Sequence, residues 1–247
     1  MHIPARRRPE FDEARIYEYK PAEPKEPQHL ADIGDAGLGI DRMDSVGPLG
    51  LGAFITPSGE IKAGQWGMIP PHSKTRIPYT RVGERMSTNN ARRETIASAW
   101  TFAPAWKSGQ RCIVSAWYWV EPYWGMKTRN IWWKFGRADG RVAGLAGFYS
   151  HWKDPMTGES VPNFTLITQN CDAPPLLSLM HRPDKAERRS VVLVEPEDWG
   201  TWLNGTAAQA EALIHLPPPG TLAHGAENPQ DEQLLPPELL AHLKSLG

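Results

Sequence analysis

The sequence predicts an α+β fold, with a mostly antiparallel sheet and helices at its flanks. Segments with strand character outnumber those with helix character, and they follow one another instead of alternating with long helices. The chain has 247 residues, which suits one large domain or two small ones and is ample for a hydrophobic core. No internal repeat is visible, so nothing indicates a solenoid.

Strands are expected where short apolar runs lie between turn-forming residues. Residues 50–69 predict two strands around "PSGE", and residues 129–152 predict a hairpin around "RADGR". The run 111–120, "RCIVSAWYWV", is almost wholly apolar, which predicts a strand buried on both faces. Two more strands are expected at 162–170 and 188–196.

Turn formers and apolar spacing predict several short helices. The first starts at "NN" and is broken by Pro104, and a later one is stopped by Gly205. The expected helices are 89–100, 174–181, 195–205, 207–216 and 236–247.

Composition divides the chain into three parts. Residues 1–46 are Pro-rich and charged with poor periodicity, so we expect an arm wrapped over the domain or partly disordered. Residues 47–216 hold most of the expected elements and form the predicted domain. Residues 217–247 start with a Pro-rich, linker-like stretch and end in a short amphipathic helix.

The net charge of −1 hides an asymmetry along the chain. Residues 60–190 hold 19 Lys and Arg against 10 Asp and Glu, a balance of +9, and the remainder holds 8 against 18, a balance of −10. A basic block with interleaved aromatic residues is typical of a nucleic-acid groove. The alternative is that these charges spread over all faces of the domain.

The motifs of several enzyme classes are absent from the sequence. We find no Walker A motif, no GxGxxG, no HExxH and no GxSxG, and the eight histidines lack ligand spacing. This argues against nucleotide hydrolysis, Rossmann chemistry and zinc proteolysis, so we expect no metal, cofactor or nucleotide. The two cysteines, the lack of a bilayer-spanning run and the lack of a secretory signal predict a cytoplasmic protein with no membrane partner. We also expect a monomer. Cys112 lies in a strand and is expected to be a small buried hydrophobe.

Three polar residues stand at the ends of apolar segments. Asn90 opens a predicted helix, Glu121 ends the aromatic strand and His181 follows "LLSLM". Each has an ordinary explanation: a helix N-cap, a solvent-facing strand end, and a histidine favoured by a helix C-terminus. Together they offer a general acid/base pair and an amide that orients a ligand. Because "SAWYWVEPYW" surrounds Glu121 with three Trp and two Tyr, we expect these rings to raise its pKa.

Four landmarks in order resemble the SOS response-associated peptidase (SRAP) family. They are "GQWGMIPPHSK", "STNNARRETIASAW", the strand ending in "WYWVEP", and "LMHRPD", and the similarity covers roughly residues 47–216. The resemblance implies a barrel-like β core in a nucleoid-associated protein that shields abasic sites in single-stranded DNA. In the family, removal of the initiator Met exposes an N-terminal Cys. Its α-amine forms a Schiff base with the ring-opened sugar, and its thiolate closes a thiazolidine crosslink. The peptidase activity is this self-removal of Met.

The resemblance also implies roles for individual positions. Asn90 matches the amide near the reacting N-terminus, Glu121 the acid that moves protons around the imine, and His181 the residue that helps to open the sugar ring and to reverse the crosslink. Trp66 and Gly67 match the element on which a base stacks, for which an exposed Trp66 would be suitable. The arginines expected to hold the DNA backbone are Arg76, Arg81, Arg85 and Arg92.

The sequence departs from the family at its second residue, which is His2 instead of Cys. His2 has no thiol to close a thiazolidine, and neither Cys112 nor Cys171 has a free α-amine. Three explanations stay open: a true Met-Cys start encoded elsewhere, loss of crosslinking with DNA binding retained, or a reversible, lyase-like Schiff base without the thiol. The leading hypothesis is therefore an SRAP-type protein that acts on single-stranded or abasic DNA. The alternatives are a non-catalytic DNA-binding module and a protein-interaction surface.

Overall fold

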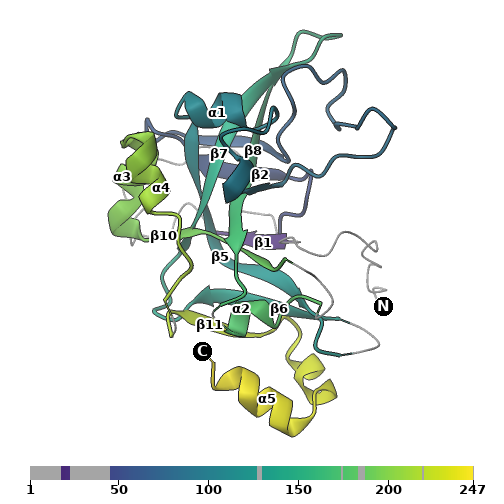
Figure 1. Ribbon diagram of the computed structural model, residues 1–247, viewed down its shortest axis with the longest axis vertical. Coiled ribbons are helices and arrows are strands. Elements are labelled where there is room, and N and C mark those ends of the chain that lie inside the picture. Colours follow the sequence, from purple (N-terminus) through teal and green to yellow (C-terminus); the bar gives the residue numbers. More distant parts are fainter. Residues whose placement is uncertain are drawn as a thin grey trace.

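The computed structural model describes residues 18–22, 45–126, 130–173, 175–182, 187–218 and 220–246. In these ranges the strands belong to one sheet, and short helices lie on its outside (Figure 1). The strands are β1 (Glu18–Pro21), β2 (Leu51–Ile55), β3 (Ile61–Trp66), β4 (Asn90–Arg92), β5 (Arg111–Tyr123), β6 (Ile131–Arg137), β7 (Ala143–Lys153), β8 (Ser160–Asn170), β9 (Arg189–Val191), β10 (Leu193–Val194) and β11 (Leu222–Ala226). The α-helices are α1 (Ala103–Lys107), α2 (Pro175–Ser178), α3 (Trp199–Asn204), α4 (Ala207–Ala212) and α5 (Pro237–Lys244), with 3-10 turns at Arg93–Thr95, Pro196–Asp198 and Pro229–Leu234.

Five of these strands close into a barrel. β7 pairs with β8, β8 with β3, β3 with β2 and β2 with β5, and β5 returns to β7. All of these pairings are antiparallel except that of β3 with β8. The predicted α+β class with a barrel-like core is therefore confirmed.

β5 carries the chain out of the barrel. Its first half pairs with β7, whereas residues 119–123 pair with β6, and β1 lies along residues 116–120 on the other edge. β6 then pairs with β11, so that β1, β5, β6 and β11 form an outer sheet, of which β6 and β11 lie in the lower part of Figure 1 above α5. Glu121 belongs to this outer sheet.

Two expectations about strand pairing are wrong. Residues 129–152 do form strands, but β6 pairs with β5 and β11, while β7 pairs with β5, β8 and β10, so they make no hairpin. A cross-strand aromatic pair favours the β5–β6 pairing, because the Trp119 and Phe135 rings stack with their centres 5.6 Å apart. The expected linker after residue 217 contains β11, whose Leu222 and Ala226 are buried against β6.

The expected helix at 89–100 is also wrong. Asn90 starts strand β4, which runs parallel to β8, and a 3-10 turn follows at Arg93–Thr95. α1 begins only at Ala103 and has Pro104 in its first turn, where the missing N–H of proline costs no hydrogen bond. A tertiary pairing with β8 has overridden the local helical pattern.

The helices α3 and α4 close one side of the barrel. The Trp202 indole is fully buried and donates its N–H to the Cys112 carbonyl over 2.9 Å. The Arg111 guanidinium donates to the carbonyls of Trp202 and Gly205, which satisfies the C-terminal end of α3. Cys112 has no exposed surface, as predicted. In the described ranges, no helix has the length and apolar character needed to cross a bilayer.

Candidate functional site

Glu121 is a buried acid in the outer sheet. It lies opposite Trp133 in the β5–β6 register, and only 1% of its surface is exposed. Neither carboxyl oxygen has a hydrogen-bond partner among the described residues. Burial raises the pKa of Glu121 to about 8, because desolvation penalises the charged form. Its ordinary explanation, a solvent-facing strand end, is therefore wrong, and the expected rise in pKa is confirmed.

Aromatic rings explain why water does not reach this carboxyl group. Trp119, Glu121 and Tyr123 alternate along β5, so their side chains share one face of the sheet. All three are buried, and the Tyr123 and Trp133 rings lie 5.7 Å apart. Because its pKa is raised to about 8, the carboxyl group favours its neutral, protonated form at neutral pH.

Cys171 lies within electrostatic range of Glu121. It follows the last residue of β8, and its backbone N–H donates to the Arg188 carbonyl over 2.9 Å. Burial raises the pKa of the Cys171 thiol above its usual range, and the nearby Glu121 raises it further. The fully buried thiol is therefore neutral, which makes it a poor nucleophile.

His181 lies just beyond α2 and approaches the same strand end. It is 3% exposed, and its backbone N–H donates to the Ser178 carbonyl over 3.3 Å. The next residue, Arg182, places its guanidinium 5.5 Å from the centre of the Trp124 ring, three residues beyond Glu121. The structure thus brings the His181 segment to the strand end that carries Glu121.

Asn90 is half-buried at the start of β4 and is not a helix N-cap. Its position is fixed by the preceding residue, because the Asn89 carbonyl accepts hydrogen bonds from the Trp66 indole (2.8 Å) and the Leu166 backbone N–H (3.0 Å). The Trp66 ring also contacts Tyr19, with the ring centres 5.3 Å apart, and Tyr19 pairs with Trp119 of β5. Asn90 is thereby linked to the outer sheet through packed aromatic rings.

The base-stacking role expected of Trp66 does not fit its position. Its ring has no exposed surface, so it has no free face for a base, and it instead holds the Asn89 carbonyl in place. Gly67 has a φ of +148°, and a Cβ there would lie 3.0 Å from Leu49 Cδ2. These two residues shape the turn that leads to the next loop.

The four expected phosphate-binding arginines are exposed and belong to two regions. Arg76, Arg81 and Arg85 lie in the loop 70–88 between β3 and β4. Arg92 ends β4 and forms a 3.0 Å ion pair with Glu187, so a phosphate there has to compete with a carboxylate. Within the described ranges, no group of three His, Cys, Asp or Glu side chains is arranged to bind a metal ion.

The sequence reasoning missed Cys171 and Trp124 as neighbours of the site. Cys171 follows a strand far from Glu121 in the sequence, and only the course of β8 brings the two together. The aromatic run "WYWVEPYW" was the available signal for Trp124, but its cation–π contact joins segments 58 residues apart, Trp124 to Arg182.

Comparisons with known proteins agree with this architecture. The family described as SOS response associated peptidase (SRAP) matches residues 51–224. A crystal structure of a protein from Bordetella bronchiseptica is 30% identical, with a TM-score of 0.72 over 85% of this chain and 98% of that chain. A protein from Bacteroides thetaiotaomicron is 22% identical, with a TM-score of 0.65 over 83% of this chain and 87% of that one. A phage-related protein from Bordetella bronchiseptica is 17% identical, with a TM-score of 0.56 over 86% and 93% of the two chains. No curated protein matches the chain.

The closed barrel and its similarity to these structures define a protein of the SRAP fold class. The chain belongs to the SRAP family, since the match spans most of its length. Family membership supports a DNA-related role in the SOS response.

Proposed function

We propose that this protein binds single-stranded DNA at abasic sites and that Glu121 transfers the proton in Schiff-base chemistry there. One observation carries the proposal: the Glu121 carboxyl group is fully buried and has no hydrogen-bond partner among the described residues, and it lies beside the segment that holds His181. A buried, unpaired carboxyl group lowers the stability of the fold. Such groups are therefore found most often at functional sites, where the chemistry needs them.

The proposed step uses the neutral form of the acid. An α-amine attacks the sugar aldehyde carbon and gives a carbinolamine, whose hydroxyl group takes the Glu121 proton and leaves as water. The nitrogen lone pair then forms the C=N bond, and the resulting carboxylate accepts a proton when water adds back. Because the pKa of Glu121 is about 8, both directions are accessible near neutral pH.

The experiment is a trapping assay with labelled abasic single-stranded DNA and borohydride on a denaturing gel. We expect a shifted band from the trapped protein–DNA product. Glu121→Gln should slow the formation of this product at least tenfold. The matched control is Glu159→Gln, at an exposed residue in the β7–β8 turn. A wild-type rate for Glu121→Gln would remove this residue from the mechanism. The lack of any band for the wild type would reject covalent chemistry altogether.

A second candidate function is DNA binding without covalent chemistry. It is favoured by the two thiols, because Cys112 and Cys171 are both fully buried and neither is accessible to a DNA strand. This version predicts salt-dependent binding of single strands with no trapped product. Arg81→Gln should then reduce the slope of log affinity against log salt concentration by about one. The control is Lys134→Gln, at an exposed residue of β6, which should leave this slope unchanged.

A further inference from the structure

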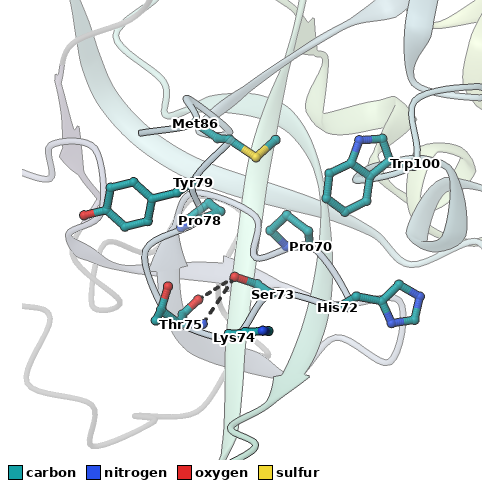
Figure 2. Close-up of a pocket in the computed structure, with 9 residues that line it drawn as sticks. All are labelled: Pro70, His72, Ser73, Lys74, Thr75, Pro78, Tyr79, Met86 and Trp100. Carbon is teal, nitrogen blue, oxygen red and sulfur yellow. Dashed lines mark hydrogen bonds between the residues drawn. The ribbon is translucent and has the colours of Figure 1, made fainter. Parts of the chain in front are cut away.

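A surface pocket of about 280 Å³ is lined by residues of the loop 70–88 and by Trp100, and Glu121 is not among its lining residues. Figure 2 shows Trp100 at one side of this pocket and Tyr79 at the other, with Pro70 and Pro78 between them. Lys74 adds a cation to the lining. Drug-sized ligands occupy pockets of about 300–1,000 Å³, so this pocket suits a single planar ring with its attachment.

The two rings of this pocket are unusually exposed for their size. Trp100 is 58% exposed and Tyr79 is 53% exposed, whereas Trp66, Trp119, Trp133 and Trp202 are fully buried. In the described ranges, seven large hydrophobic side chains are exposed, and four of them belong to this loop or pocket: Ile77, Tyr79, Val82 and Trp100. The apolar surface that the fold leaves uncovered is thus concentrated here, as is typical of a binding site.

The pocket is held in shape by hydrogen bonds to buried residues. The Trp152 indole donates to the Ser73 carbonyl over 3.0 Å, and the Gln65 amide donates to the Arg76 carbonyl over 3.2 Å. Both donors are 3% exposed, so the loop is anchored to the barrel. A further bond of 2.9 Å, from the Met86 N–H to the Pro78 carbonyl, closes a small hairpin that presents Tyr79. Little ordering is therefore left for a ligand to impose.

The charge of the loop favours an anionic ligand. Residues 70–88 hold four Lys and Arg against one Glu, a balance of +3. Lys74, Arg76 and Arg81 are exposed, and no carboxylate of the described residues lies within ion-pair distance of them. The orientation of the Arg76 side chain is also fixed, because its Nε–H donates a hydrogen bond to Gln65 Oε1 over 3.1 Å.

We propose that the pocket between Trp100 and Tyr79 binds one unpaired base of single-stranded DNA, while Lys74 and Arg76 hold the adjacent phosphates. The proposal rests on the proposed DNA-binding function and adds the rings that take the base, in place of the buried Trp66. Exposed aromatic faces beside cations are the combination that single-strand binders use. A Pro-rich peptide would also fit aromatic rings, but it gives the cations of the loop no partner.

The test is a pair of binding titrations with fluorescent strands of equal length, an oligo-dT and a backbone of the same length without bases. Trp100→Ala and Tyr79→Ala should each weaken oligo-dT binding about tenfold or more. They should leave the affinity for the baseless strand within about twofold. Trp100→Phe keeps a ring and should retain most of the affinity.

The control is Leu234→Ala, which removes an exposed apolar side chain near the C-terminus, and it should bind both strands as the wild type does. Photocrosslinking with 5-iododeoxyuridine should attach the strand to Trp100 or Tyr79. If the wild type binds oligo-dT and Trp100→Ala binds it equally well, the pocket assignment alone is rejected. An equal loss on both strands also rejects it. If the wild type binds neither strand, or binds only a Pro-rich peptide, the proposed function is rejected with it.

Discussion

The substitution Glu121→Gln should change how the stability of the protein depends on pH. The glutamine has nearly the same shape, but it carries no titratable proton. In the folded wild type the pKa of Glu121 is raised by burial from 4.5 to about 8. The unfolded chain therefore loses this proton at lower pH than the folded chain does.

The sign and size of the change in the free energy of unfolding with pH follow from proton linkage. Below pH 4.5 both states hold the proton, and Glu121 adds no pH dependence. Between pH 4.5 and 8 the folded state binds more protons, so the free energy of unfolding falls as the pH rises, and it levels off above pH 8. At 1.36 kcal/mol for each pKa unit, the loss between pH 5 and pH 9 is about 4 kcal/mol.

The assay is urea unfolding of the wild type and of Glu121→Gln across this pH range. Other titrating groups cancel in the difference between the two proteins, and so does the constant cost of burying an amide. We expect the variant to gain about 4 kcal/mol relative to the wild type from pH 5 to pH 9, while Glu159→Gln gains nothing. A pH-independent difference for Glu121→Gln would show that the carboxyl group is hydrated or paired in solution, and it would refute the reasoning.

Two further predictions concern the frame of the site. Gly67→Ala should lower the free energy of unfolding by about 2 kcal/mol, because the φ of +148° is unfavourable for alanine and the new Cβ would crowd Leu49; an unchanged urea midpoint would contradict this. His224 accepts a hydrogen bond from the Trp133 indole over 3.1 Å, and burial lowers its pKa. The unfolded chain therefore binds a proton at His224 at higher pH than the folded chain does. As the pH falls through the usual histidine range, the free energy of unfolding should decrease for this reason. Removing the titration with His224→Leu should flatten the acid side of the pH profile, and an unchanged acid limb would count against it.

Most of the barrel was predictable from the sequence because its strands carry strong local signals. Residues 111–120 form an apolar run, and 162–170 form another between turn formers, and both became strands. The burial of Cys112 and the raised pKa of Glu121 follow from the same apolar surroundings. Residue types alone also indicated Asn90, Glu121 and His181 as candidates for the site.

The sequence by itself determined the family and the strand-forming segments, because apolar periodicity and short motifs are local properties. Only the tertiary structure decided the partners: β6 joins β5 instead of β7, residues 90–92 leave a helical pattern to pair with β8, and Trp66 turns inward. The reason is that pairing and burial are decided by competition between distant segments, which no local pattern records. The base-binding role proposed for Trp100 and Tyr79 depends on that outcome, since it is burial elsewhere that leaves these two rings exposed.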